Sequence, residues 1–275
     1  MKIAFIGAGR MAEALIARLK GHSILASDIS AQRLQSLGKK YKIGTTSDNA
    51  AALAFGDIVI LAVKPQQMAE VLEGLKGLGS RGLPAGRHGK GQGSKIIISI
   101  AAGIPLGYLQ KKLPGIAIIR AMPNNPCLIG EGITALAGGK RTTVKELKKA
   151  GLIFKNVGQV LEVPEKWMNA VTGLSGSGPA FVYQVIEGLI EGGRKAGLPK
   201  ALAAELALQT LIGAAKTAKA SGSTPAELTA MVASPGGTTI EGLAVMKKHR
   251  TAQAVALAVL AAAKKSGLLT KRWTL

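Results

Sequence analysis

The first twenty residues constrain the fold of this 275-residue chain more than any other stretch. A short apolar segment, Lys2 to Ile6, leads into Gly7-Ala8-Gly9-Arg10-Met11-Ala12, and a helical pattern follows over Met11 to Lys20. In such a G-x-G-x-x-A turn the first glycine permits the tight turn, and the second lets a pyrophosphate approach the backbone. The start of the helix adds free N–H groups and a favourable dipole. The sequence therefore predicts a strand–turn–helix unit that binds a dinucleotide.

An acidic residue stands where the second expected strand, Ser23 to Ser27, ends. Asp28 lies about 20 residues beyond the glycines, where an acid usually accepts hydrogen bonds from the ribose of NAD and repels a 2′-phosphate. Ser27, Ser30 and Arg33 could instead contact that phosphate, and Asp28 could equally be a helix cap or a turn residue. We assign Ser27 and Asp28 to the cofactor site and leave the choice between NADH and NADPH open.

The first half of the chain alternates short apolar runs with helical patterns. Strands are expected over residues 2–6, 23–27, 57–63, 95–100 and 116–120, and helices over residues 11–20, 30–39 and 65–75. The continuous apolar run at 57–63 is typical of a strand covered on both faces. This alternation predicts an α/β fold with a Rossmann-type, doubly wound parallel sheet. The glycine-rich, basic stretch Gly77 to Ser94 has no apolar period, and we expect it to be a mobile surface loop.

Strand signals disappear after about Pro164, and long patterns rich in Ala and Leu replace them. Helices are expected over residues 179–196, 199–221, 225–233, 239–248 and 252–266, several with proline near the start. These helices are apolar around much of their circumference, which calls for more packing partners than a domain of this size offers. We therefore expect a dinucleotide-binding domain over residues 1–160 and an all-α dimerisation and substrate domain over residues 161–275. A homodimer is the expected unit, within a larger homo-oligomer or by itself.

Charge raises one competing interpretation, because 36 Lys and Arg face 15 acidic residues, for a formal net charge of +21. Nucleic-acid binders usually group such charge with aromatic stacking residues. Here aromatic residues make up 3 % of the chain, and the basic residues are scattered. We expect a generally basic surface, which concerns solubility and association, and no nucleic-acid partner.

Three further observations concern the compartment and the metal content. The apolar run Ala254 to Ala263 is about half of the roughly 20 residues that a spanning helix needs, so no membrane partner is expected. The N-terminus enters a strand and a glycine turn at once, which differs from a signal peptide. The single cysteine, Cys127, makes no internal disulfide and has no neighbouring pair of Cys or His ligands. We expect a cytoplasmic protein without a bound metal.

Several segments resemble the pyrroline-5-carboxylate reductase family in order and spacing, and together they cover nearly the whole chain. Generic Rossmann dehydrogenases lack the last two, which makes those two the most specific. In order, the segments are Ile6-Gly7-Ala8-Gly9-Arg10-Met11-Ala12, Ala62-Val63-Lys64-Pro65, Ser99-Ile100-Ala101-Ala102-Gly103, Arg120-Ala121-Met122-Pro123-Asn124-Asn125-Pro126, Thr172 to Ala180, and Val232 to Glu241.

The resemblance implies a role for each matching position. Residues of the glycine turn would hold the pyrophosphate of NADPH or NADH: Ile6, Gly7, Ala8, Gly9, Arg10 and Met11. Residues after later strands would line the rest of the cofactor site: Asn49, Ala62, Val63, Lys64, Pro65, Ile100, Ala101 and Ala102. Lys64 could equally cap the end of its strand. Residues of the last segment would bind the substrate: Ser234, Gly236, Gly237, Thr238 and Thr239.

The implied activity is the reduction of 1-pyrroline-5-carboxylate to L-proline, the last step of proline biosynthesis. The segment Ser234 to Thr239 precedes a helix, and its glycines let backbone N–H groups face a carboxylate. An ordinary helix cap would use the same residues. The protonated ring nitrogen makes the imine carbon electrophilic, and water can supply that proton. We therefore expect no strong acid in the site, and we take Thr239 as the catalytic hydroxyl that orients the ring nitrogen.

The main alternative is another Rossmann-type NAD(P)-dependent reductase, of the 3-hydroxy-acid or ketopantoate kind. Those enzymes rely on a lysine or an acid in the helical domain, and no such residue stands out after Pro164. The chain also departs from the family pattern. Asn125 replaces a common Thr, Gly222 stands where some relatives have Glu, and the 77–94 stretch is longer than in many relatives.

Overall fold

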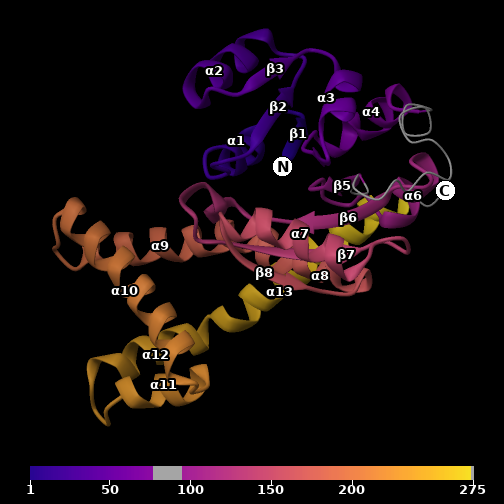
Figure 1. The fold of residues 1–275 in the computed structure, drawn as a ribbon. Helices are drawn as coiled ribbons and strands as arrows, with labels where there is room; N and C mark the ends of the chain where they lie inside the picture. The colour runs from indigo at the N-terminus through magenta and orange to yellow at the C-terminus, as the bar shows by residue number, and fades with distance from the viewer. Residues whose placement is uncertain (77–94, 274–275) are drawn as a thin grey trace. The chain divides into compact units, whose positions relative to one another are not determined.

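The computed structural model describes residues 1–76 and 95–273. The basic stretch 77–94, for which we expected a surface loop, lies outside the described residues. The chain divides into two compact units: Met1–Gly176 together with Ala261–Leu275, and Ser177–Leu260. Figure 1 shows the first unit as the sheet-bearing part of the ribbon and the second as helices. These compact units divide after Gly176. The expected functional domains, 1–160 and 161–275, stay a prediction.

One sheet organises the first unit, and its described part has eight strands in the order β3-β2-β1-β4-β5-β6-β7-β8. The strands are β1 (Lys2–Ile6), β2 (Ser23–Ser27), β3 (Gly44–Thr46), β4 (Ile58–Leu61), β5 (Ile96–Ser99), β6 (Ala117–Met122), β7 (Gly132–Gly138) and β8 (Gly158–Glu162). All neighbours are parallel except β6 and β7. The chain moves outward from β1 to β3 and then returns to β4 on the other side of β1. The carboxyl ends of β1 and β4 therefore form a topological switch point, where ligands of such sheets bind.

Helices cover both faces of this sheet. They are α1 (Arg10–Ile16), α2 (Ala31–Tyr41), α3 (Asn49–Phe55), α4 (Met68–Gly74), α6 (Leu106–Lys112) and α7 (Val144–Lys155), with short turns η1 (Pro65–Gln67) and η2 (Asn125–Ile129). Alternate residues of β1 enter different cores: Ile3 and Phe5 pack in one cluster, and Ala4 and Ile6 in the other. This two-sided burial explains why the central strands are continuously apolar.

Residues 161–176 pack with the sheet-bearing unit. After the end of β8 they form η3 (Glu165–Trp167), α8 (Met168–Val171) and the π-helix η4 (Thr172–Gly176), and Met168 is buried in one of the two cores. The last helix, α13 (Thr251–Lys271), returns to this unit at its carboxyl end. There the amide oxygen of Asn169 accepts hydrogen bonds from Ser266 Oγ at 2.8 Å and Thr270 Oγ1 at 3.1 Å. Those bonds explain why the carboxyl terminus belongs to the first unit.

The second unit consists of α9 (Gly178–Lys195), α10 (Lys200–Ser221), α11 (Pro225–Val232), α12 (Thr238–Lys248) and the first half of α13. Its helix starts carry clear signals, such as the capping box of Thr224 with Glu227 before α11. Within residues 177–260 only Ala203 and Ala207 are buried, although the helices are rich in apolar residues. Exposed large side chains on these helices include Tyr183, Leu189, Leu202, Leu206, Ile212, Met231 and Val245.

Candidate functional site

The turn between β1 and α1 requires glycine at its first position. Gly7 has φ +94°, and a Cβ there would lie 2.8 Å from backbone atoms of Ala62 and Val63. Its N–H donates to the carbonyl of Ser27 at 2.8 Å, so the turn joins the ends of β1, β2 and β4. Gly9 caps α1 without any side-chain hydrogen bond, and the space where its Cβ would stand is open. At Gly9 the turn thus offers open backbone to a ligand, which is what a pyrophosphate needs.

Asp28 is committed to the backbone of this turn. One carboxylate oxygen accepts from the N–H of Ala8 at 2.7 Å, and the other accepts from the N–H of Ser30 at 2.9 Å. The interpretation of Asp28 as a turn residue therefore describes these contacts. Its contact with a ribose stays a prediction.

Beyond Asp28, a cluster of four charged or polar side chains links α1 and α2. Arg33 Nε donates to the carbonyl of Ala8 at 2.7 Å, and Arg33 Nη2 donates to Glu13 at 2.6 Å. The other oxygen of Glu13 accepts from Lys40 Nζ at 3.0 Å and from the Tyr41 hydroxyl at 2.9 Å. These donors lower the pKa of Glu13 from its ordinary 4.5 to about 2, with Lys40 the largest cause and Arg33 the next. Sequence reasoning named Arg33 but missed Glu13, Lys40 and Tyr41.

The ends of β2 and α3 meet through Ser27 and Asn49. The buried Ser27 hydroxyl donates to the amide oxygen of Asn49 at 2.7 Å. Asn49 opens α3 directly after its cap, Asp48, whose carboxylate accepts from the N–H of Ala50 at 2.7 Å. Because Ser27 takes the amide oxygen, the Nδ2 donors of Asn49 are the part of that side chain suited to a ligand.

The other expected cofactor residues follow β4 and β5 at the same edge of the sheet. The N–H of Ala62 donates to the carbonyl of Ile6 at 2.7 Å, and the N–H of Ile100 donates to the carbonyl of Leu61 at 3.1 Å. The ends of β1, β4 and β5 therefore lie side by side, as a parallel sheet requires. Lys64 is exposed and makes no side-chain cap bond to η1, so its contact with cofactor stays a prediction.

In the second unit, the turn before α12 contains the expected substrate residues. Gly236 adopts φ +69°, and the N–H of Gly237 donates to the carbonyl of Ser234 at 2.9 Å. Gly237 caps α12 without a side-chain hydrogen bond. Thr238 is exposed and Thr239 is half-buried. The ordinary cap, in which a threonine side chain satisfies the helix end, is therefore not what the structure shows at Gly237.

Comparison with known proteins decides the family. A pyrroline-5-carboxylate reductase of a Synechocystis species is 42 % identical over 278 residues, covering 99 % of both chains. One from Methanosarcina acetivorans is 41 % identical, covering 98 % of each. The chain belongs to the pyrroline-5-carboxylate reductase family. The family model described as pyrroline-5-carboxylate reductase dimerisation matches residues 165–269, and one described as NADP oxidoreductase, coenzyme F420-dependent, matches residues 2–103.

Solved structures of reductases in this family confirm the fold class. The Plasmodium falciparum pyrroline carboxylate reductase with NADP bound superposes with a TM-score of 0.86 at 32 % identity, covering 98 % of both chains. The Coxiella burnetii pyrroline-5-carboxylate reductase gives 0.85 at 32 % identity with the same coverage. The prediction of a Rossmann-type sheet followed by an all-α dimerisation domain is confirmed, and the chain is an NAD(P)H-dependent oxidoreductase.

Two polar residues of the segment Arg120 to Pro126, which resembles the reductase family, link separate parts of the first unit. The nearly buried Arg120 pairs with Glu165 at 3.3 Å, and the same oxygen of Glu165 accepts from the N–H of Leu106 at 2.6 Å. Burial lowers the pKa of Arg120, and the charge of Glu165 opposes that shift. Asn124 donates to the carbonyl of Ser175 at 3.1 Å. The sequence suggested no role for Arg120 or Asn124. For Arg120 the available signal was its position inside the otherwise apolar strand β6, whereas Asn124 lies after the end of that strand.

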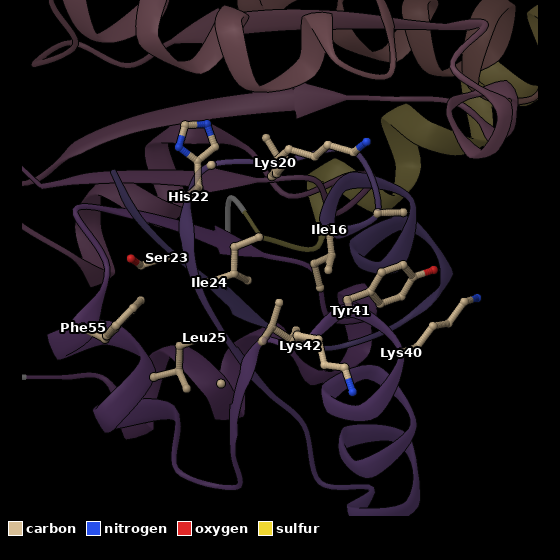
Figure 2. A pocket seen from close by; sticks show the side chains of 15 residues that line it. Ile16, Lys20, His22, Ser23, Ile24, Leu25, Lys40, Tyr41, Lys42 and Phe55 are labelled. Atoms are coloured by element: carbon tan, nitrogen blue, oxygen red, sulfur yellow. The ribbon is translucent and has the colours of Figure 1, made fainter.

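Two features of the reductase lie apart from the expected site. A cavity of about 700 Å³ opens at the amino ends of β2 and β3, and Figure 2 shows Lys20, Lys40, Lys42 and Tyr41 among its lining side chains. None of the expected site residues lines it. Cys127 is buried, and burial raises the pKa of its thiol. Within residues 1–76 and 95–273, no group of three or more His, Cys, Asp or Glu could hold a metal ion.

Proposed function

We propose that this chain reduces 1-pyrroline-5-carboxylate to L-proline with NADPH or NADH. The supporting observation is 42 % identity to a reductase of that name over 99 % of both chains. The glycine turn at the switch point supports the cofactor half of the proposal, and the segment at residues 234–239 supports the substrate half. This full-length identity favours the proposed activity over the alternative, a reductase of the 3-hydroxy-acid or ketopantoate kind.

The residues present fit a dinucleotide. Gly7 makes the tight turn, and Gly9 leaves the backbone open to the pyrophosphate. Arg10 and Met11 begin the helix whose free N–H groups would face it. The donors of Asn49, with the residues after β4 and β5, would hold the remaining parts: Ala62, Val63, Lys64, Pro65, Ile100, Ala101 and Ala102. Ser27 supports Asn49 through the hydroxyl bond described above. When bound, the reduced nicotinamide supplies the hydride.

The substrate residues act by binding and orientation. Backbone N–H groups of the turn at residues 234–239 would donate hydrogen bonds to the substrate carboxylate, aided by the start of α12. The ring nitrogen takes its proton from water, and the hydroxyl of Thr239 accepts a hydrogen bond from that N–H. Holding the ring in this way presents its C=N carbon to the hydride, so position and charge complementarity supply most of the rate. Ser234 and Thr238 would be the remaining polar residues around the substrate.

We further propose a cytoplasmic homodimer, by itself or as the unit of a larger homo-oligomer. The dimerisation match over residues 165–269 and the exposed apolar side chains of α9 to α12 support it. The helix α13 has the length and the mean hydropathy, 1.3, that would permit a membrane span, and 6 % of its most apolar stretch is buried. Since the dimerisation match covers nearly all of α13, we assign its apolar surface to subunit contact and propose neither a membrane nor a nucleic-acid partner.

The test mixes the purified protein with 1-pyrroline-5-carboxylate and either NADPH or NADH and follows the absorbance of the reduced nicotinamide. Substrate-dependent loss of absorbance is expected, and none with either cofactor would contradict the proposal. Thr239→Val removes the hydroxyl at nearly constant shape and should lower kcat at least about tenfold, the usual scale for a lost orienting hydrogen bond. Thr239→Ser is the matched control and should retain most of kcat. Equal kcat for Val and wild type would remove Thr239 from the chemistry.

A further inference from the structure

The cluster of Glu13, Arg33, Lys40 and Tyr41 has no part in the proposed function so far. It lies directly against the glycine turn, because Arg33 contacts the carbonyl of Ala8 through Nε and that of Gly9 at 3.4 Å through Nη2. The Glu13 side chain is 21 % exposed and that of Arg33 is 30 % exposed, so their charges are only partly screened by water. A cation beside this turn therefore faces a carboxylate that balances it.

The cluster stands at the place where the two nicotinamide cofactors differ. In Rossmann folds an acid after β2 binds the free ribose hydroxyls, and a nearby arginine accommodates a 2′-phosphate. Here the acid after β2 is Asp28, and both of its oxygens are taken by backbone N–H groups. Asp28 can still accept from a ribose hydroxyl through its remaining lone pairs. The attraction for a 2′-phosphate therefore comes from Arg33, and Glu13 offsets the positive charge of Arg33.

We propose that Glu13 is a specificity-determining residue for the cofactor: its single negative charge offsets part of the positive charge of Arg33 and Lys40 and so limits the preference for a 2′-phosphate over a free ribose hydroxyl. This inference rests on the proposed function, since it takes the glycine turn as the dinucleotide site. Glu13 acts through the two cations and is a positioning residue in that sense.

The sign of the effect follows from charge. A phosphate carries close to two negative charges at neutral pH, whereas the ribose hydroxyl carries none. Removing the charge of Glu13 leaves Arg33 anchored by the carbonyl of Ala8 and raises the local positive charge by one. Binding of the phosphorylated ligand should tighten about five- to tenfold, the scale of one partly screened charge. Binding of the ligand without that phosphate should change less than about twofold.

The test uses calorimetric binding of two fragments, 2′,5′-ADP and 5′-AMP, which differ only in the 2′-phosphate. Glu13→Gln should tighten 2′,5′-ADP about five- to tenfold and leave 5′-AMP nearly unchanged, an effect that higher salt reduces. Glu70→Gln, at an exposed acid of α4, is the matched control and should change neither. Lys40→Met, at a side chain 61 % exposed, should act in the opposite direction and covers the case in which Glu13→Gln folds poorly.

A double substitution tests whether Glu13 acts on the bound phosphate through Arg33. If Glu13 acts through Arg33, Glu13→Gln added to Arg33→Met should give little further gain for 2′,5′-ADP. An equal change in both fragments, or no change in either, would overturn the role of Glu13 while leaving the cofactor site in place. Failure of both fragments to bind the wild-type protein would instead overturn the cofactor site itself.

Discussion

Two glycines two positions apart should respond to the same substitution in different ways. At Gly7, alanine would adopt φ +94°, a conformation that costs a residue with a side chain about 1 to 3 kcal/mol. Its Cβ would also lie 2.8 Å from backbone atoms of Ala62 and Val63. That backbone has little room to yield, because the N–H of Ala62 is bonded to Ile6 at 2.7 Å across the sheet. We expect Gly7→Ala to destabilise the protein by about 3 kcal/mol or more.

Gly9→Ala is the matched control. Its φ of −68° suits any residue, and no atom lies within 4 Å of the added Cβ, so the loss should stay below about 1 kcal/mol, typical of a helix cap. The same Cβ would stand where a pyrophosphate approaches the backbone, so binding of NADP⁺, which carries that pyrophosphate, should weaken at least about tenfold.

Thermal unfolding at one protein concentration and calorimetry measure the two effects. A loss of 3 kcal/mol corresponds to a fall of about 6 to 12 °C in Tm for a chain of this size. Wild-type stability for Gly7→Ala would refute the argument from close packing. Wild-type affinity for Gly9→Ala would refute the argument that a ligand approaches the open backbone.

Two other predictions concern ionised side chains. The depressed pKa of Glu13, about 2, means that its ionised form stabilises the fold fully above about pH 4.5 and that this contribution is lost as pH falls toward 2. The stability gap between wild type and Glu13→Gln, about 1 to 2 kcal/mol after screening, should therefore shrink by more than half between pH 5 and pH 3 in urea unfolding. A gap independent of pH would contradict this. Glu165→Gln leaves the buried Arg120 without its counter-charge and should cost about 2 kcal/mol in the same assay, whereas Glu70→Gln should cost nothing measurable.

The sequence predicted the central sheet well because burial on both faces leaves a continuous apolar run. It missed β3, β7 and β8 for physical reasons. β3 has three residues, Gly44 to Thr46, and none of them is buried. Between its two terminal glycines, β7 mixes Ile133 and Leu136 with a threonine and two alanines, so it shows no continuous run of large apolar residues. β8 lies at the edge with no buried residue. A short strand at the edge of a sheet pairs with one neighbour and stays exposed, so it can form without a run of apolar residues.

In the candidate site, too, some residues could be predicted from the sequence and others could not. The residues after β1, β4 and β5 could be predicted, because parallel strands bring their carboxyl ends to one edge and the chain signals each end. The contacts of Glu13 could not, because its partners Arg33 and Lys40 lie 20 and 27 residues along the chain. A scattered basic sequence offers many cations, and only the packing of α1 on α2 selects these two.

The second unit buries only Ala203 and Ala207 within residues 177–260, and this has a practical consequence. Helices that bury so little apolar surface among themselves depend for their free energy of folding on a partner that packs against them. The melting temperature of this unit therefore has a meaning only at a stated protein concentration. Dilution dissociates the subunits, and the helices lose their stability with that contact.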